Sequence, residues 1–319
     1  MKVLVTGGAG FIGSHIVDAY CELGHDVVAL DDLSTGHAEN VNHAARLVHM
    51  DIRNPALDEL FATERFEVVN HQAARGNVRA SIEDPIVYAD VNVVGGARLL
   101  ESSRKHGVRK FIYASTGGCV YGEPKYVPSD EAHPIAPRDP YGASKASFEL
   151  YLPVFAHIWG LTYTIFRYPN VYGPRQDPFG EAGVISIFLG QMFRGQQPII
   201  NGDGNQERDY VFVADVAKAN VLGLDRGDNE VFNVGWGVGT SVNTIFRTLR
   251  QLSGSKALEV HGPAKVGEVR RSCLDSAKAA RMLGWIPTTP LNDGLAQTAA
   301  YVESNMTNHL DAAHREPNR

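Results

Sequence analysis

Tyr141 and Lys145 are the residues of this chain whose types and spacing best suit chemistry. They stand four residues apart in the stretch YGASK, which places both side chains on one face of a helix. A tyrosine hydroxyl acts as a base only after losing its proton, and a neighbouring ammonium group favours that loss. The pair therefore predicts proton abstraction from a substrate by Tyr141, with Lys145 as its electrostatic partner.

The spacing by itself is not specific, because Tyr121 and Lys125 share it. Pro124 lies between those two residues and disfavours a helix there, so we interpret that pair as a decoy. Tyr141 instead follows Pro140, opens a helical pattern, and comes after the apolar run KFIYAS. Ser115 and Thr116 at the end of that run are candidate hydroxyl partners for the base.

A glycine-rich turn near the start of the chain predicts a cofactor site. Gly7, Gly10 and Gly13 recur at every third position, between a strand-like run and a helical pattern that ends at Gly24. Glycine there permits a tight turn, close approach to a diphosphate and contact between helix and strand, and the helix amides face the anion. The residues predicted to contact a dinucleotide here are Gly7, Gly10, Phe11, Ile12 and Gly13.

An acidic residue after the next strand-like run narrows the choice of dinucleotide. Asp31 lies 18 residues beyond Gly13, close to the spacing of a carboxylate that binds the adenosine ribose. It would repel a 2′-phosphate, so NAD is favoured over NADP. Alternatively, Asp31 and Asp32 only cap the loop DDLSTG. The candidate cofactor contacts in this loop are Asp31, Asp32, Ser34, Thr35 and Gly36.

The ends of two further strand-like runs add candidates. Asp51 could accept the adenine amino group while Ile52 covers the ring, but Asp51 could equally cap a helix that begins near Pro55. The stretch HQAA contributes Gln72, Ala73 and Ala74 to the predicted cofactor site.

The order of the elements predicts the fold class. Strand-like runs at 2–6, 26–30, 46–50, 67–71, 110–115 and 162–167 alternate with helical patterns. This is typical of an α/β protein with a Rossmann-type doubly wound parallel sheet, which binds ligands beyond the carboxyl ends of its strands. In the helical stretch 84–107, Asn92 lies on the apolar face, and Gly95 and Gly96 would let another element approach closely.

The second half of the chain predicts a smaller C-terminal α/β lobe that binds the substrate. We assign residues 1–169 and about 211–240 to the NAD-binding domain, 170–210 and 241–305 to the lobe, and 306–319 to a frayed polar tail. Pro153 is expected to interrupt the helix that follows YGASK.

Composition excludes several classes of function. The formal net charge of -6 offers no basic surface for nucleic acid. The three cysteines are widely spaced, which suits free thiols in the cytoplasm and neither a disulfide framework nor a metal site. The first strand leaves no room for a signal peptide before it, and no apolar run approaches bilayer length.

Together these motifs resemble the extended short-chain dehydrogenase/reductase family, specifically nucleotide-sugar epimerases of the UDP-glucose 4-epimerase type. The resemblance rests on the glycine turn, Asp31, the Ser115–Thr116 tip, YGASK, RYPNVYGPRQ and GDGNQERDYVFVADVA. It implies an isomerase that keeps NAD bound and inverts C4 of a UDP-sugar through a transient 4-keto sugar. Tyr141 would be the base, Lys145 its partner and ribose ligand, and Thr116 or else Ser115 the hydroxyl that holds the sugar oxygen.

The resemblance also implies roles outside YGASK. Asn92 and Tyr168 match positions near the cofactor, and Asn170 and Arg208 match positions that hold the nucleotide diphosphate. Three departures from the family pattern are notable: Gly117 stands at the usual position of the catalytic hydroxyl, Lys265 replaces an arginine before the Gly–Glu268 pair, and the small Ser272 stands at a gate beside the sugar. The candidate substrate contacts are Thr116, Tyr141, Asn170, Arg208, Lys265, Glu268 and Ser272.

Other reactions on the same scaffold remain as alternatives. The resemblance implies that dehydratases need an acid–base pair after the catalytic threonine and that decarboxylases need a nearby glutamate, whereas Gly117, Gly118 and Cys119 follow Thr116 here. A non-catalytic NAD-binding protein would be expected to lack Tyr141 or Lys145. UDP-glucose and UDP-galactose are the default sugars, Ser272 favours the N-acetylated pair, and UDP-glucuronate stays open. The family implies a homodimer through a four-helix bundle of residues 84–106 and 142–159.

Overall fold

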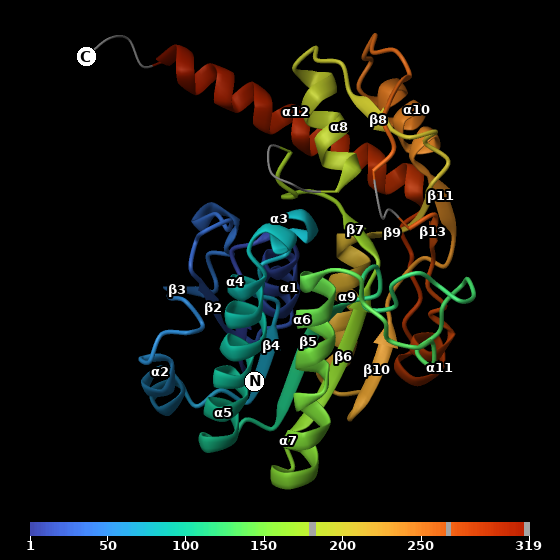
Figure 1. Ribbon diagram of the computed structural model, residues 1–319. Helices are drawn as coiled ribbons and strands as arrows, with labels where there is room; N and C mark the ends of the chain where they lie inside the picture. The colour runs from blue at the N-terminus through green and yellow to red at the C-terminus, as the bar shows by residue number, and fades with distance from the viewer. Residues whose placement is uncertain (179–182, 266–268, 316–319) are drawn as a thin grey trace.

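The computed structural model describes residues 1–178, 183–265 and 269–315 (Figure 1). Its centre is a seven-stranded sheet in the order β3-β2-β1-β4-β5-β6-β10, in which every pair is parallel. The strands are β1 (Lys2–Thr6), β2 (Asp26–Asp31), β3 (Arg46–His49), β4 (Val68–His71), β5 (Lys110–Thr116), β6 (Thr162–Tyr168) and β10 (Glu230–Asn233). The predicted doubly wound sheet is confirmed, and β10 adds a strand that was not among the predicted runs.

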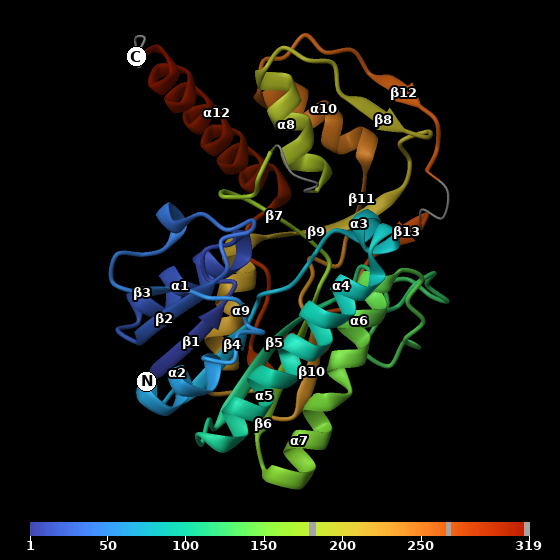
Figure 2. The ribbon, with the colours of Figure 1, turned by 60° about the vertical axis from the view of Figure 1, so that its left-hand side comes forward.

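Helices cover both faces of the sheet (Figure 2). Because neighbouring residues of a strand point to opposite faces, Val3 and Val5 of β1 pack in one core and Leu4 in the other. The first core includes α1 (Phe11–Glu22) and α9 (Val213–Gly223). The second core includes α2 (Leu57–Glu64), α5 (Gly96–Lys105), α6 (Pro140–Glu149) and α7 (Tyr151–Trp159).

The predicted helical stretch 84–107 forms, with a distortion at its centre. A short helix α3 (Val78–Glu83) precedes α4 (Pro85–Ala89), the π-helical segment η2 (Asp90–Gly95) and α5. A Cβ atom on Gly95 would lie 2.8 Å from Cδ1 of Ile52, and one on Gly96 would lie 2.5 Å from Cε2 of Phe148. The expected close approach at both glycines is confirmed.

The helix that carries YGASK is interrupted as Pro153 suggested. α6 ends at Glu149 and α7 begins at Tyr151. Proline has no N–H to donate to the carbonyl of Glu149, and its ring crowds that carbonyl, so the regular helix cannot run through this point.

The smaller lobe lies over the carboxyl ends of the large sheet (Figure 1). One of its sheets is formed by β7 (Asn170–Tyr172), β9 (Glu207–Phe212), β11 (Gly239–Ser241) and β13 (Arg271–Ser272), and a second by β8 (Ile199–Asn201) and β12 (Val260–Gly262). A separate core joins α8 (Val184–Phe193), α10 (Val242–Leu252) and α12 (Leu291–Arg315). The turn η1 (Ala38–Asn40) and the helix α11 (Ala277–Leu283) complete the described elements.

Two boundaries differ from those that the sequence suggested. Leu283 of α11 and Trp285 pack in the core of the large domain, and Trp285 Nε1 donates to the carbonyl of Asp215 at 2.8 Å, so this segment does not belong to the lobe. The polar tail expected from residue 306 is wrong as far as Arg315, because α12 continues to that residue. No glycine or proline lies between Leu295 and Arg315, and a helix anchored by its packed first turns propagates through such a stretch.

Candidate active site

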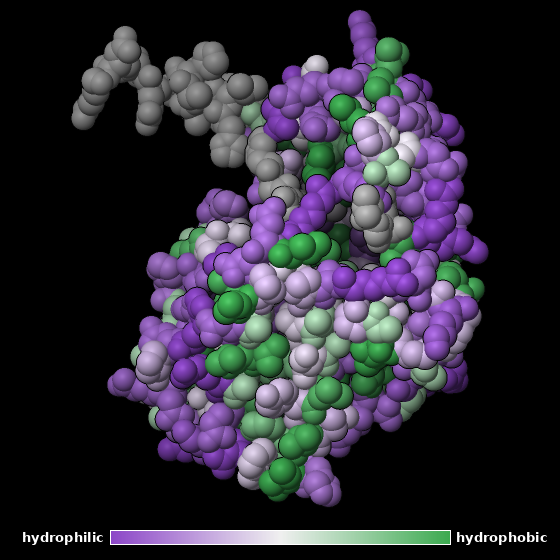
Figure 3. Space-filling view, viewed as in Figure 1, coloured by the Kyte–Doolittle hydropathy of each residue, from purple (hydrophilic) through white to green (hydrophobic). Residues whose placement is uncertain are grey.

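The structure brings the predicted cofactor residues to one edge of the large sheet. They follow the carboxyl ends of β1, β2, β3, β4 and β6, or lie on η2 and α6 beside them. The molecular surface is hollowed between this edge and the small lobe (Figure 3). Residues distant in the sequence therefore share one groove, as expected for a doubly wound sheet.

The glycine turn has the geometry of a diphosphate cradle. Gly7 adopts a φ of +68°, and a Cβ atom there would lie 2.7 Å from the backbone nitrogen of Ala73. A Cβ atom on Gly13 would overlap the carbonyl oxygen of Gly7. Gly10 precedes α1 without a side-chain cap, which leaves the first amides of the helix for an anion. These residues fit the diphosphate of a dinucleotide.

Asp31 is held at the end of β2 by backbone N–H groups. It is buried; its Oδ2 accepts from Ala9 N at 3.0 Å and its Oδ1 from Leu33 N at 2.8 Å, while Asp32 Oδ1 accepts from the N–H and hydroxyl of Ser34. Burial raises the pKa of Asp31, and these N–H groups oppose the shift. Asp31 and Asp32 therefore cap the loop DDLSTG, as the alternative interpretation predicted. Because a carboxylate accepts about four hydrogen bonds, Asp31 keeps capacity for a ribose.

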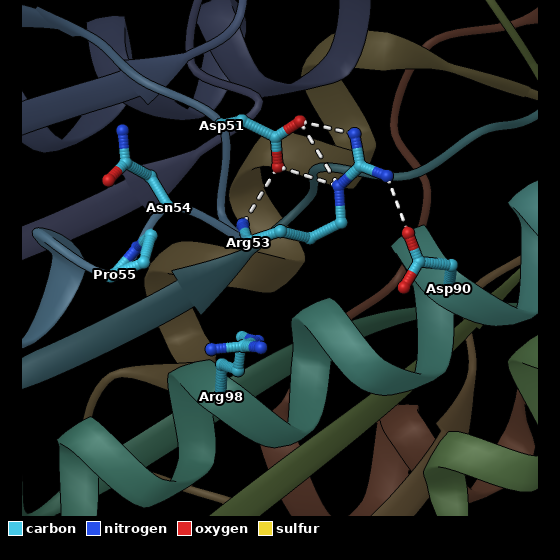
Figure 4. A pocket seen from close by; sticks show the side chains of 6 residues that line it. All are labelled: Asp51, Arg53, Asn54, Pro55, Asp90 and Arg98. Carbon is cyan, nitrogen blue, oxygen red and sulfur yellow. Dashed lines mark hydrogen bonds and ion pairs between the residues drawn. The ribbon is translucent and has the colours of Figure 1, made fainter.

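Asp51 does not cap a helix, so that interpretation is wrong. Instead Asn54 Oδ1 accepts from Ala56 N, and α2 begins at Leu57. Asp51 is bound by Arg53, which also reaches Asp90 of η2 (Figure 4). The hydrogen bond from Arg53 lowers the pKa of Asp51. These residues line a pocket of about 530 Å³ formed by Asp51, Arg53, Asn54, Pro55, Asp90 and Arg98.

A buried polar network fixes two other predicted cofactor residues. Gln72 Nε2 donates to Asn70 Oδ1 at 2.6 Å, and Asn220 Nδ2 donates to the hydroxyl of Tyr168 at 2.8 Å. Asn70 Nδ2 in turn donates to Asn220 Oδ1 and to the hydroxyl of Tyr20. Because their partners lie inside the protein, Gln72 and Tyr168 have little freedom to rotate.

Asn92 joins the loop after β4 to the helix that carries the base. Its Oδ1 accepts from Arg75 N at 2.9 Å, and its Nδ2 donates to the carbonyl of Arg75 and to Ser144 Oγ. Ser144 Oγ donates to the carbonyl of Tyr141 at 2.7 Å. The amide of Asn92 therefore makes its hydrogen bonds within the protein, and it links the loop after β4 to α6.

The helix α6 presents the predicted base and its partner on successive turns. Asp139 Oδ1 accepts from Gly142 N at 2.7 Å and caps the helix, with Pro140 at its first position. Lys145 is buried, and its Nζ donates to the carbonyl of Ala114 at 2.8 Å. Burial lowers the pKa of Lys145 to about 7, and the charge of Glu149 opposes that shift.

Thr116, and not Ser115, is the hydroxyl next to the base. The hydroxyl of Thr116 lowers the pKa of the Tyr141 phenol, although burial is the larger effect and raises it. Ser115 Oγ faces the other way and donates to Glu149 Oε1 at 2.5 Å. Successive residues of a strand point to opposite faces, which separates the two hydroxyls.

Ser115 donates to a buried ion pair between Arg167 and Glu149 that was not predicted from the sequence. Arg167 Nε donates to Glu149 Oε1 at 3.0 Å and its Nη2 to Oε2 at 2.5 Å, and both side chains are 4% exposed. Arg167 Nη1 donates to the hydroxyl of Tyr121. The signal was available, because Glu149 follows Lys145 by four residues on the same helix. Tyr121 lies in a turn, so Tyr121 and Lys125 are not carried on a helix, as Pro124 suggested.

Cys119 is a second neighbour of the base that the sequence analysis did not assign. Its thiol is hydrogen-bonded to Thr116, and a Cβ atom on Gly142 would lie 3.0 Å from Cβ of Cys119. Burial raises the pKa of Cys119 to about 12, so the thiol stays protonated. Cys119 packs against Gly142 of α6, and no spacing in the sequence predicts this contact.

The predicted substrate residues lie on the small lobe. Arg208 of β9 pairs in register with Ser272 of β13, and its charge lowers the pKa of Cys119. Asn170 begins β7 beside β9, and Lys265 is exposed after β12. Glu268 lies outside the described residues.

Within the described residues, Cys21, Cys119 and Cys273 are free thiols, and no group of three or more metal-binding side chains is found. The same residues contain no helix with the length and apolar character needed to cross a bilayer.

Comparison with known proteins adds to this geometry. Residues 3–235 match the model of the NAD dependent epimerase/dehydratase family. The chain is 49% identical over 303 residues to a putative UDP-glucose 4-epimerase from Methanocaldococcus jannaschii, covering 95% of this chain and 99% of that one. The crystal structure of UDP-glucose 4-epimerase with UDP-glucose from Thermotoga maritima matches with a TM-score of 0.94 at 47% identity, over 96% and 100% of the two chains. That of the Thermus thermophilus UDP-glucose 4-epimerase complex with NAD matches with a TM-score of 0.90 at 40% identity, over 95% and 99%.

Proposed function

Because this chain belongs to the NAD dependent epimerase/dehydratase family, we propose that it is an isomerase that inverts C4 of a UDP-hexose, with UDP-glucose and UDP-galactose as the default pair. One observation carries the proposal within that family. The helix α6 carries Tyr141 one turn before the buried Lys145, whose Nζ donates to the carbonyl of Ala114 in β5, and the hydroxyl of Thr116 two residues along that strand acts on the phenol.

We assign the binding of NAD to the residues along this edge. The glycine turn and the start of α1 would hold the diphosphate, Asp31 the adenosine ribose, and Tyr168 and Lys145 the nicotinamide end. Bound NAD supplies a hydride acceptor for C4 of the sugar and later returns the hydride.

The protein's own part is to move one proton and to keep the reacting groups in place. Tyr141 would take the proton from the 4-hydroxyl, and the neighbouring hydroxyl of Thr116 would orient that group. In its protonated form Lys145 favours the phenolate, since an opposite charge nearby stabilises the ionised form.

On the substrate side, we propose that Asn170 and Arg208 hold the nucleotide diphosphate, with Lys265 as a further phosphate contact. Glu268 is proposed only as a contact of the substrate. A guanidinium and an amide are suitable donors to phosphate oxygens. Ser272 is buried next to Arg208 in the register, and its small size favours space for a 2-acetamido group. The N-acetylated pair is therefore the second candidate substrate, and UDP-glucuronate a third.

The site does not favour a lyase. Gly117, Gly118 and the protonated thiol of Cys119 follow Thr116, and none of them can act as the acid–base pair that elimination of water requires. The carboxylate of Glu149, buried on the same helix as Tyr141, is bound on both oxygens by Arg167 and does not shuttle protons. Epimerisation needs no additional acid.

Replacement of the base tests the proposal. The variant Tyr141→Phe should keep NAD bound and lose about 10²- to 10⁴-fold in turnover of UDP-glucose, the usual contribution of a general base. Tyr126→Phe makes the same chemical change at an exposed position and should leave turnover unchanged. Full activity in Tyr141→Phe would reject the assignment. Release of NADH during turnover would indicate a simple dehydrogenase, and purified protein without dinucleotide would indicate a different function altogether.

The identity of the sugar is tested separately. Purified protein is offered UDP-glucose, UDP-galactose, UDP-N-acetylglucosamine and UDP-glucuronate in turn, and the products are separated by chromatography. We expect interconversion of the first two. Exclusive conversion of the acetylated or carboxylated sugar would move the assignment to that substrate.

We also propose that the enzyme is a cytoplasmic homodimer. Exposed apolar side chains gather over α4–α5 and α6–α7 (Figure 3), including Ile86 at 78% exposure, Leu150 at 68% and Ile158 at 58%. Two such helix pairs from two copies would form a four-helix bundle that covers these side chains. The free thiols suit a reducing compartment. Sedimentation measurements would test the dimer.

A further inference from the structure

Arg53 binds the two carboxylates that flank it in an arrangement that the proposed reaction does not require. Its Nε donates to Asp51 Oδ1 at 3.0 Å, its Nη2 to Asp51 Oδ2 at 2.6 Å, and its Nη1 to Asp90 Oδ2 at 2.6 Å (Figure 4). The guanidinium therefore spans from the loop after β3 to the π-helical segment η2. The side chains of Asp51 and Asp90 are 31% and 48% exposed, so the cluster is open to solvent.

The contacts around Asp51 leave it one acceptor position. A carboxylate has about four lone-pair directions. Oδ1 accepts from the backbone nitrogen of Arg53 at 2.7 Å, Oδ2 accepts from Nη2 at 2.6 Å, and the single Nε–H is shared between Oδ1 at 3.0 Å and Oδ2 at 3.2 Å. Three N–H groups therefore bind the carboxylate, which leaves one of its four directions free. The planar fork of an arginine fixes the plane of the carboxylate that it binds, so this free direction is fixed as well.

The π-helical segment supports Arg53 from the other side. Gly95 lets the loop approach closely, since a Cβ atom there would lie 2.8 Å from Cδ1 of Ile52 and 3.4 Å from Cγ of Arg53. Asp90 faces Arg53, whereas Asn92, two residues later, faces Ser144 of α6. One distorted turn thus contacts both the loop after β3 and the helix of the base. π-Helical turns are common where a helix serves a functional site.

We propose that Arg53 is a positioning residue for recognition of the cofactor's adenine: it fixes Asp51 so that the remaining acceptor direction of the carboxylate receives the adenine amino group, and Asp90 holds Arg53 in place. This inference rests on the proposed function and on the interpretation of the sequence that puts Asp51 and Ile52 at the adenine end of NAD.

The charges of the cluster agree with recognition of a hydrogen-bond donor. Arg53 lowers the pKa of Asp51, so the carboxylate is an acceptor at neutral pH and cannot donate. An ionised carboxylate accepts a hydrogen bond from an amino group and repels a carbonyl oxygen. Hypoxanthine has a carbonyl at the position of the adenine amino group, so its dinucleotide is a suitable probe.

The experiment measures the selectivity of the holoenzyme between two dinucleotides. The protein is incubated with equal concentrations of NAD and nicotinamide hypoxanthine dinucleotide until exchange is complete, then denatured, and the released dinucleotides are separated by chromatography. We expect the wild-type protein to retain mainly NAD. In Arg53→Met the ratio of bound NAD to the analogue should fall by about 10-fold or more, the usual effect of losing a hydrogen bond to a charged group.

Three variants show whether that fall comes from positioning. Asp51→Ala should lose the selectivity as fully as Arg53→Met, and Asp90→Asn should lose part of it. Arg98→Met is the matched control: Arg98 lines the same pocket but makes no hydrogen bond or ion pair with the described residues, so its removal should leave the ratio unchanged. If Arg53→Met does not fold, Arg53→Lys keeps the charge, loses the fork and should lower the ratio in the same direction.

An unchanged ratio in Arg53→Met beside a lost one in Asp51→Ala would overturn the role of Arg53. A wild-type ratio that Asp51→Ala leaves unchanged would overturn the placement of Asp51 at the adenine. Protein that retains neither dinucleotide would contradict the proposed function itself.

Discussion

Two arginine–carboxylate clusters lie at the two ends of the groove, and they differ mainly in burial. Arg167 and Glu149 behind the base are each 4% exposed, and every polar contact they make is to the protein. Arg53, with Asp51 and Asp90 at the other end, has a side chain 35% exposed in an open pocket. A guanidinium–carboxylate pair is therefore excluded from water in the first cluster and accessible to water in the second.

The difference teaches what each kind of cluster can do. A buried ion pair must have its hydrogen-bonding capacity met from within, because each unmet bond in a low dielectric is costly. Glu149 and Arg167 consequently fix β5, β6 and α6 relative to one another and have nothing left for a ligand. An open cluster tolerates an unused acceptor because water can occupy it, so Asp51 stays available to a ligand.

Removal of each arginine should give the largest contrast. Arg167→Met leaves the carboxylate of Glu149 buried without a partner and should lower the free energy of unfolding by about 3–5 kcal/mol. Arg53→Met breaks a partly exposed pair and should cost less than about 1 kcal/mol. Urea denaturation of both variants measures the two losses.

The double variant Arg167→Met with Glu149→Leu serves as the control for the buried pair. It removes both charges together and should recover most of the stability lost in Arg167→Met, as replacement of a buried pair by apolar groups often does. Equal losses for the two single variants would show that burial does not separate the clusters.

A smaller contrast is expected within the catalytic end, between the two neighbouring hydroxyls of β5. Thr116→Val removes the hydrogen bond to Tyr141 and should lower turnover by about 10- to 100-fold, equivalent to the roughly 1.5–3 kcal/mol of a bond to a charged group. Ser115→Ala removes a bond to Glu149 and should act on stability, by about 1 kcal/mol, with turnover close to wild type. Steady-state kinetics on both variants measure the two losses of turnover. A larger loss in Ser115→Ala than in Thr116→Val would make Ser115 the catalytic hydroxyl.

The last contrast concerns the dependence of stability on pH. Burial lowers the pKa of Lys145 to about 7 from its usual 10.5. Between these values the unfolded chain binds a proton that the folded chain does not, so Lys145 makes stability rise with pH, by at most about 1.4 kcal/mol per unit. Below pH 7 both states are protonated and this contribution is constant.

Unfolding free energies at pH 7 and pH 8.5 measure this dependence. Lys145→Met should lack the rise that the wild-type protein shows, whereas Arg53→Met should retain it, because an arginine does not titrate in this range. An equal pH dependence in wild type and Lys145→Met would mean that the ammonium is not destabilised by burial.

Much of this site could be predicted from the sequence because its signals are local. Gly7 and Gly13 are required by the geometry of a single turn, and Tyr141 with Lys145 is a spacing on one helix, so each can be identified without the rest of the chain. Alternating apolar runs likewise determine a parallel sheet, since each buried strand needs helices on both faces. The carboxyl edge of that sheet then follows as the location of the site.

Only the tertiary structure decided which neighbouring groups meet. Ser115 and Thr116 are neighbours in the sequence, and only the structure shows that Ser115 faces Glu149 whereas Thr116 faces Tyr141. The binding of Arg53 to Asp90, and the inclusion of Trp285 in the large core, join segments 37 and 70 residues apart. Such contacts depend on how packed elements bring side chains together, and the residues involved have no periodicity or fixed spacing that would reveal the contact in advance.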